Sequence, residues 1–165
     1  MSWSEIIILS DINDFGTYKP FLKLEEDVNF DNKFCILKTN EGNIAFSFYD
    51  LGVAPSVVID NQMAFLSFGN SYYVINLFKK KILTKCINTL STIFEIIKCN
   101  SRECVVFVGE VSLICFNLAG QLMWRNTYEN SIYDWVISDE EIFIVFENDQ
   151  KMSVSFEDGN VVVVT

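Results

Sequence analysis

The amino-acid sequence predicts an all-β fold of short antiparallel strands arranged in repeated four-stranded units. The first observation is a recurring glycine turn between two apolar segments, in which Gly159 follows Gly120 by 39 residues (159 − 120 = 39). A degenerate copy lies earlier, where Leu77 precedes Leu118 by 41 residues (118 − 77 = 41). The second observation is that the apolar segments are short and rich in β-branched residues, as strands are. A period of about 40 residues therefore indicates a repeat architecture.

The composition is that of one folded domain. The chain has 165 residues, of which 50% are hydrophobic and 15% aromatic, and this is too apolar for a disordered segment. Two prolines and no low-complexity stretch leave no linker that would divide it. We therefore expect a single all-β domain over residues 1–165, with N-terminal strands and an acidic loop in 1–52 and three repeats of about 40 residues in 53–165.

The N-terminal part begins with an isoleucine-rich segment that predicts a strand over residues 4–10. Residues 11–16 are turn-forming and predict a loop, and an extended piece over 21–25 follows Pro20. Residues 25–32 are too acidic for a strand interior, so we expect an exposed loop. Two further strands, 34–39 and 44–49, flank a tight hairpin at Gly42.

Each of the three repeats contains four short apolar segments that are separated by hairpin-length turns. Only residues 87–97 have a spacing loose enough for a helical turn, and their β-branched content argues against it, so helix content should be very low. The expected strands are 57–60, 63–68, 72–77 and 82–86 in the first repeat, 94–99, 104–108, 111–118 and 122–127 in the second, and 132–137, 142–147, 151–156 and 161–165 in the third.

Four antiparallel strands per repeat are typical of a β-propeller blade. Residues 117–124, with Gly120 and Trp124, resemble the Gly-x-x-x-Trp turn of quinoprotein-type propeller blades, and this resemblance implies that the Trp packs between neighbouring blades. Val163 and Leu83 stand in its place in the other repeats, and no quinone cofactor is implied. The length allows at most four blades, so we expect an incomplete, open β-propeller-like array of three to four four-stranded blades, with a β-sandwich as the alternative.

No catalytic motif is present. The chain has no histidine, which removes Ser-His-Asp and Cys-His machinery and the commonest transition-metal ligand, and no phosphate-binding glycine loop. Five cysteines lie in no zinc or redox spacing, although Cys99 and Cys104 could face each other across a turn, and we expect buried free thiols. Acidic pairs lie in turns, where solvation explains them better than a calcium site or a carboxylate hydrolase. We expect a protein that is not an enzyme, with no metal and no cofactor.

Net charge is the second informative feature. Twelve Lys and Arg against 22 Asp and Glu give a net charge of −10 and a pI near 4.4. This charge disfavours nucleic acid and favours a basic protein partner, unless it serves solubility alone. The apolar runs are shorter than the about 20 residues that span a bilayer, and no secretory signal opens the chain, so we expect a cytoplasmic protein without a membrane partner.

Aromatic residues beside carboxylates are the best candidates for a contact surface, because interfaces use rigid aromatic anchors with a polar rim. Trp135 is expected in the core, and Asp134 must then point to the opposite face of the strand. The candidate partner-binding residues are Asp14, Tyr18, Glu25, Glu26, Asp27, Asp31, Tyr133, Asp134, Asp139 and Glu140.

A small, acidic, all-β chain without histidine resembles bacterial immunity proteins, the inhibitors that cover the active site of a cognate toxin, as in contact-dependent growth inhibition. The resemblance implies that carboxylates occupy the phosphate-binding site of a basic nuclease, with a monomer forming a 1:1 complex. The alternative is a propeller-like adaptor that binds a peptide or partner at an open sheet edge. The partner's identity and the face used are not predicted.

Overall fold

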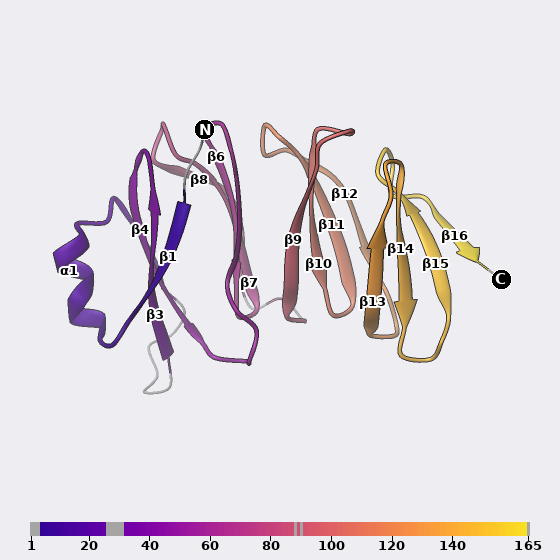
Figure 1. Ribbon diagram of the computed structural model, residues 1–165, viewed down its shortest axis with the longest axis horizontal. Helices are drawn as coiled ribbons and strands as arrows, with labels where there is room; N and C mark the ends of the chain where they lie inside the picture. Colours follow the sequence, from indigo (N-terminus) through magenta and orange to yellow (C-terminus); the bar gives the residue numbers. More distant parts are fainter. Residues whose placement is uncertain (1–3, 26–31, 88, 90, 165) are drawn as a thin grey trace.

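Four four-stranded sheets are stacked side by side in the computed structural model, which describes residues 4–25, 32–87, 89 and 91–164 (Figure 1). The sheets follow one another in chain order, and β1 and β16 lie in sheets that are separated by the two middle ones. This arrangement confirms the predicted all-β, incomplete β-propeller-like array of three to four blades, and the number of sheets is four. Glu26, Asp27 and Asp31 lie outside the described residues.

Every predicted strand is confirmed, and its ends lie within two residues of the predicted ends. The first sheet contains β1 (Ser4–Leu9), β2 (Leu22–Glu25), β3 (Asn32–Thr39) and β4 (Gly42–Tyr49); the second β5 (Ser56–Asp60), β6 (Met63–Phe68), β7 (Ser71–Asn76) and β8 (Lys81–Cys86); the third β9 (Ile93–Cys99), β10 (Cys104–Gly109), β11 (Ser112–Asn117) and β12 (Leu122–Thr127); the fourth β13 (Ile132–Ile137), β14 (Glu141–Phe146), β15 (Lys151–Ser155) and β16 (Val161–Val164).

The first sheet departs from the prediction in two ways. Its order is β1-β3-β4-β2, and β2 pairs with β4 in parallel rather than antiparallel. Because β1 and β2 run in the same direction, the chain must cross the sheet between them. Residues 11–16, predicted as a loop, form the first part of this crossover as the 3-10 helix η1 (Ile12–Asp14) and the start of the helix α1 (Phe15–Tyr18). Phe15 is buried there against Ile36 and Ala45, so the crossover covers the outer face of the first sheet.

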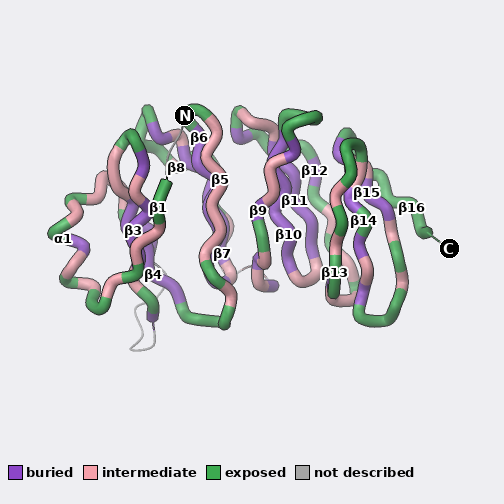
Figure 2. The backbone as a smooth tube through the Cα atoms, in the orientation of Figure 1, coloured by how far each residue is buried: buried purple, intermediate pink, exposed green. Residues whose placement is uncertain are grey.

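Each pair of neighbouring sheets encloses an apolar core (Figure 2). The strand β6 is buried along its whole length, because its side chains alternate between two neighbours: Ala64 and Leu66 face the first sheet, while Met63 and Phe65 face the third. The same holds for β10. Two buried faces explain why these strands are continuous apolar runs. A salt bridge between Lys98 Nζ and Asp60 Oδ1, 2.5 Å apart, also joins the second and third sheets.

The turn glycines and Trp124 form contacts between successive sheets. Trp124 packs between the third and fourth sheets, as the resemblance to propeller blades implied. Gly159 has a φ of +73°, and a Cβ placed there would lie 2.8 Å from the Trp124 ring. The indole Nε1 donates a hydrogen bond to the Phe156 carbonyl at 2.9 Å. Gly120 has a φ of +81°, and a Cβ placed there would lie 2.6 Å from Met63 and 2.8 Å from Val74 of the second sheet. Each turn glycine thus admits side chains of the preceding sheet.

All five cysteines are free thiols, four of them buried and Cys86 partly so. Cys99 and Cys104 are directly opposed on β9 and β10, as expected. Among the described residues, no helix is long and apolar enough to cross a membrane, and no group of three potential metal ligands occurs.

Candidate functional site

The last strands of the second, third and fourth sheets, β8, β12 and β16, occupy equivalent edges but differ in chemistry. Both β8 and β12 pair with their neighbour through a register shift, and both carry cationic residues, Lys81 and Lys85 in one and Arg125 in the other. Bulges and charges of this kind are the usual protection of a sheet edge against pairing with another chain.

The edge strand β16 has neither protection. Its four residues are all valine, and they pair with β15 without a register shift. Their side chains are 41%, 64%, 57% and 40% exposed in chain order. Figure 1 shows β16 at the end of the array, beyond β15. An unbulged, uncharged and exposed edge of β-branched residues is suited to accept an additional strand.

The pairing of β16 with β15 also decides which way Val163 points, the residue at the position equivalent to Trp124. In β12 the register shift makes room for Met123, so that Trp124 lies opposite Cys115 and faces the fourth sheet. Without such a shift in β16, Val163 lies opposite Met152, which packs toward the third sheet. Val162 and Val164 therefore face outward, whereas Val163, which stands four residues after Gly159 as Trp124 stands four residues after Gly120, faces the third sheet.

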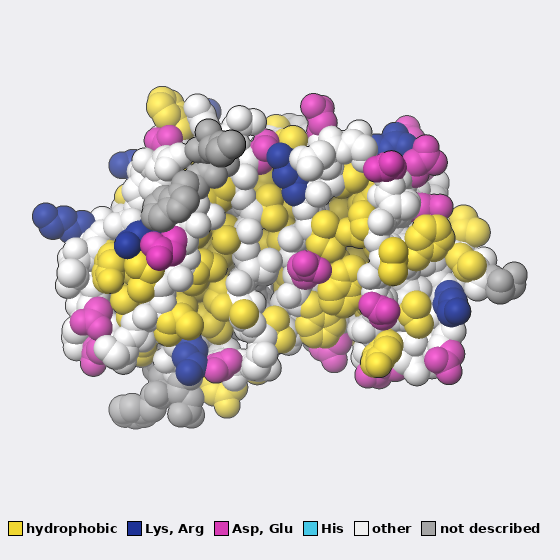
Figure 3. All heavy atoms as spheres, in the orientation of Figure 1, with side chains coloured by type: hydrophobic (Ala, Val, Ile, Leu, Met, Phe, Trp, Pro, Cys, Tyr) yellow, Lys and Arg dark blue, Asp and Glu magenta, His cyan; other side chains and the backbone are white. Residues whose placement is uncertain are grey.

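A second surface is formed where β9 and β13, the first strands of their sheets, lie side by side. The rings of Phe94 and Trp135 stack with centroids 6.1 Å apart and an interplanar angle of 3°. Trp135 is only partly buried, so it contributes to the core between the third and fourth sheets and also to the surface. Figure 3 shows hydrophobic side chains gathered between β9 and β13 with acidic side chains around them. We call Phe94, Glu95, Tyr133, Asp134 and Trp135 the β9–β13 surface.

Two carboxylates hold Trp135 in this surface. Glu95 Oε2 accepts a hydrogen bond from the indole Nε1 at 3.2 Å, and Asp134 Oδ1 accepts one from the Trp135 backbone N–H at 2.8 Å. Within the described part of the chain, neither carboxylate forms a salt bridge, although four other pairs do. Trp135 is therefore held at its ring nitrogen by Glu95 and at its backbone nitrogen by Asp134, two carboxylates that form no salt bridge within the described residues.

Tyr133 is exposed because β13 is bulged. The pairing passes from Ile132 opposite Phe146 to Asp134 opposite Val145, so Tyr133 has no cross-strand partner and is 74% exposed. The extra residue reverses the alternation, which places Ile132 and Trp135 on the same side of the strand. Asp134 points away from that side, as predicted.

The other predicted contact residues do not join this surface. Asp139 and Glu140 contact the third sheet instead: the Asp139 carbonyl accepts a bond from Ser101 Oγ at 3.1 Å, and Glu140 pairs with Arg102 at 3.5 Å. Asp14 and Tyr18 lie at the crossover on the first sheet, and Glu25 ends β2 there. The described candidates thus form two groups at opposite ends of the array (Figure 1).

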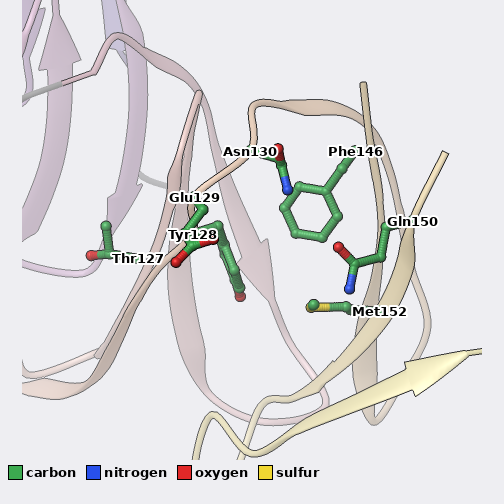
Figure 4. A pocket seen from close by; sticks show the side chains of 7 residues that line it. All are labelled: Thr127, Tyr128, Glu129, Asn130, Phe146, Gln150 and Met152. Carbon is green, nitrogen blue, oxygen red and sulfur yellow. The ribbon is translucent and has the colours of Figure 1, made fainter. Parts of the chain in front are cut away.

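A pocket of about 270 Å³ opens between the third and fourth sheets, where the chain passes from β12 to β13 (Figure 4). Tyr128, Phe146 and Met152 form its less polar wall, and Glu129 and Gln150 are among its polar residues. The rings of Tyr128 and Phe146 meet edge to face at 5.2 Å. Burial raises the pKa of Tyr128 from 10.0 to about 12, and the buried hydroxyl has no hydrogen-bond partner among the described residues.

We expect the free energy of unfolding to fall more steeply above pH 10 in the wild type than in a Tyr128→Phe variant. The neutral phenol is favoured in the folded state, so its contribution is complete below the unfolded pKa and is lost between pH 10 and 12. Urea unfolding of both proteins at pH 9, 10 and 11 measures this difference. Equal pH dependence of the two proteins would contradict a folded-state shift at Tyr128.

Comparisons with known proteins support the fold alone. No family model and no curated protein matches the chain. Among solved structures, the computationally designed Ika8 protein has a TM-score of 0.52 at 9% identity, over 82% of this chain and 46% of that one. Saccharomyces cerevisiae Sqt1 has a TM-score of 0.50 at 12% identity, over 82% and 45%. The β-propeller domain of Myceliophteria thermophila Cps50 (Swd1) gives 0.49 at 11% identity, over 66% and 37%. This chain therefore spans less than half the length of each.

None of these matches concerns toxin immunity.

The sequence did not identify Phe94, Glu95 and the β16 edge as contact candidates. Phe94 and Glu95 lie at the end of the loosely patterned segment 87–97, and nothing in it identifies β13 as the neighbouring strand. The run of four valines was visible, but it predicts a strand without indicating that the strand lies at an unprotected edge.

Proposed function

We propose that this protein is a non-enzymatic protein-interaction module that binds an extended segment of a partner protein by strand addition to β16. The observation that carries the proposal is the contrast among the three equivalent edges, since β8 and β12 combine a register shift with cationic residues and β16 has neither. In strand addition, main-chain hydrogen bonds provide affinity, and alternate side chains provide specificity.

The partner strand should be apolar at alternate positions and basic elsewhere. Exposed valines on both sides of β16 offer contacts to β-branched side chains in cross-strand pairs. The turn before β16 carries Glu157 and Asp158, and a hydrogen bond from the Asn160 backbone is the main cause that lowers the pKa of Asp158. These carboxylates, on a chain with a net charge of −10, favour and steer a cationic segment.

The test uses a six-residue acetylated and amidated peptide in which valine alternates with lysine. Its control is the same peptide with all six backbone nitrogens methylated, which keeps the side chains and the charge but removes the backbone donors on both edges. We expect the control to bind about tenfold more weakly, equivalent to about 1.4 kcal/mol. Calorimetric titration measures both dissociation constants, and equal values would show that charge alone drives binding.

Proline variants identify the edge that is used. Of two adjacent residues in β16, one directs its N–H toward β15 and the other directs it away from the sheet. One of the variants Val162→Pro and Val163→Pro removes an N–H that bonds to β15, and this variant should be destabilised. The other removes an N–H that points away from the sheet, and it should keep wild-type unfolding stability. We expect that variant to lose peptide binding, and retention of full affinity would contradict addition at β16.

A second candidate function, inhibition of a basic toxin nuclease, is favoured by the net charge of −10. Its mechanism would be occlusion of the nuclease active site by carboxylates, and the two described groups of predicted residues would have to act separately because they lie at opposite ends of the array. Binding of this kind should weaken strongly above roughly 0.5 M salt, where surface charges are screened, while strand addition should persist. Measuring partner binding at low and high salt separates the two functions.

A further inference from the structure

We propose that the β9–β13 surface is a binding site for an arginine side chain of a protein partner. The site is distinct from β16, because β13 and β16 are the opposite edges of the fourth sheet. Strand addition is disfavoured at β13, where the bulge at Tyr133 and the bond from the Trp135 N–H to Asp134 occupy the edge. Recognition at this surface must therefore use side chains.

The ligand class follows from the chemistry of the surface. Stacked Phe94 and Trp135 and the exposed ring of Tyr133 provide aromatic area that attracts a cation. Glu95 adds a carboxylate beside the Trp135 ring and Asp134 adds one at the open edge of β13, each with an oxygen beyond the one that bonds to Trp135. A guanidinium group stacks flat on aromatic rings and donates in-plane hydrogen bonds to carboxylates, whereas a lysine ammonium is a compact, strongly hydrated charge. The surface therefore fits arginine better than lysine.

The surface is also fixed before any ligand arrives. Trp135 is held by the Phe94 ring, by Glu95 at its indole nitrogen and by Asp134 at its backbone nitrogen. Its partial burial against the core adds to this restraint. A ring that is already ordered loses little conformational freedom on binding, which favours affinity.

The test is a titration of the ¹⁵N-labelled full-length protein with an acetylated, amidated six-residue peptide of alternating arginine and glycine. The reporter is the Trp135 indole N–H resonance, which a Trp135→Phe variant assigns. We expect this resonance to shift, with a dissociation constant at least about tenfold lower than for the equivalent glutamine peptide. The equivalent lysine peptide should bind more weakly than the arginine peptide. Equal affinity for lysine, or no shift of this resonance, would overturn the proposal.

The variants Glu95→Gln and Asp134→Asn remove the charges but keep an oxygen that accepts each bond from Trp135, so the fold should be retained. Each is expected to raise the dissociation constant of the arginine peptide by about fivefold or more. The matched control is Glu41→Gln, which removes an exposed carboxylate on the first sheet and should leave the Trp135 shift unchanged. Equal effects of all three variants would show that the peptide responds only to overall charge.

Discussion

Replacing Trp124 with alanine is expected to lower the free energy of unfolding by about 3 to 5 kcal/mol, the usual cost of removing a large buried aromatic side chain. Trp124 is 8% exposed and lies between the third and fourth sheets. The substitution opens a cavity against Gly159 and leaves the Phe156 carbonyl without its indole donor. Urea unfolding monitored by circular dichroism measures the change.

The control for this prediction is Met123→Ala on the same strand, because Met123 is 42% exposed and sits at the register shift beside Trp124. It should cost under about 1 kcal/mol, as exposed substitutions usually do. If Trp124→Ala cost no more than the control, Trp124 would not be the contact that holds the last two sheets together.

A Gly159→Ala substitution is expected to cost about 2 to 4 kcal/mol, because two penalties combine. Its φ of +73° is unfavourable for alanine, and the new methyl group would lie 2.8 Å from the Trp124 ring. Gly52→Ala separates these penalties, since Gly52 has a φ of +80° and nothing within 4 Å of an added Cβ. Gly52→Ala should therefore cost only about 1 to 2 kcal/mol.

The double variant Trp124→Ala/Gly159→Ala provides a further check by urea unfolding. With the ring absent, the added methyl group has room, so the two costs should sum to more than the cost of the double variant. Strict additivity, or equal costs of Gly159→Ala and Gly52→Ala, would contradict a direct contact between Gly159 and Trp124.

The strands were predictable because each apolar run ends at residues that favour turns. The turns around Gly120 and Gly159 recur at a nearly constant spacing, which predicted the repeating sheets. Runs such as β6 predicted strands without alternation, and burial on both faces explains them. The path from β1 to β2 was not predictable from local pattern, because a crossover depends on where the returning strand finds a partner.

The contact surfaces were predictable only in part. Tyr133 and Asp134 were identified from an aromatic residue next to a carboxylate, and both are exposed. Their neighbours Phe94 and Glu95 come from another sheet, a long-range contact that one sequence does not reveal. The register shifts in β12 and β13 also lie beyond local pattern, although each decides which side chains face the neighbouring sheet.

Hydrogen–deuterium exchange of the full chain, with and without the alternating valine–lysine peptide, tests the proposed function most directly. Exchange at the Val161–Val164 amides should slow on peptide addition, because the amides facing away from β15 gain acceptors on the added strand. Exchange in Leu122–Thr127, the equivalent edge of the third sheet, should be unchanged. Unchanged exchange in Val161–Val164, or equal protection of both strands, would contradict strand addition at β16.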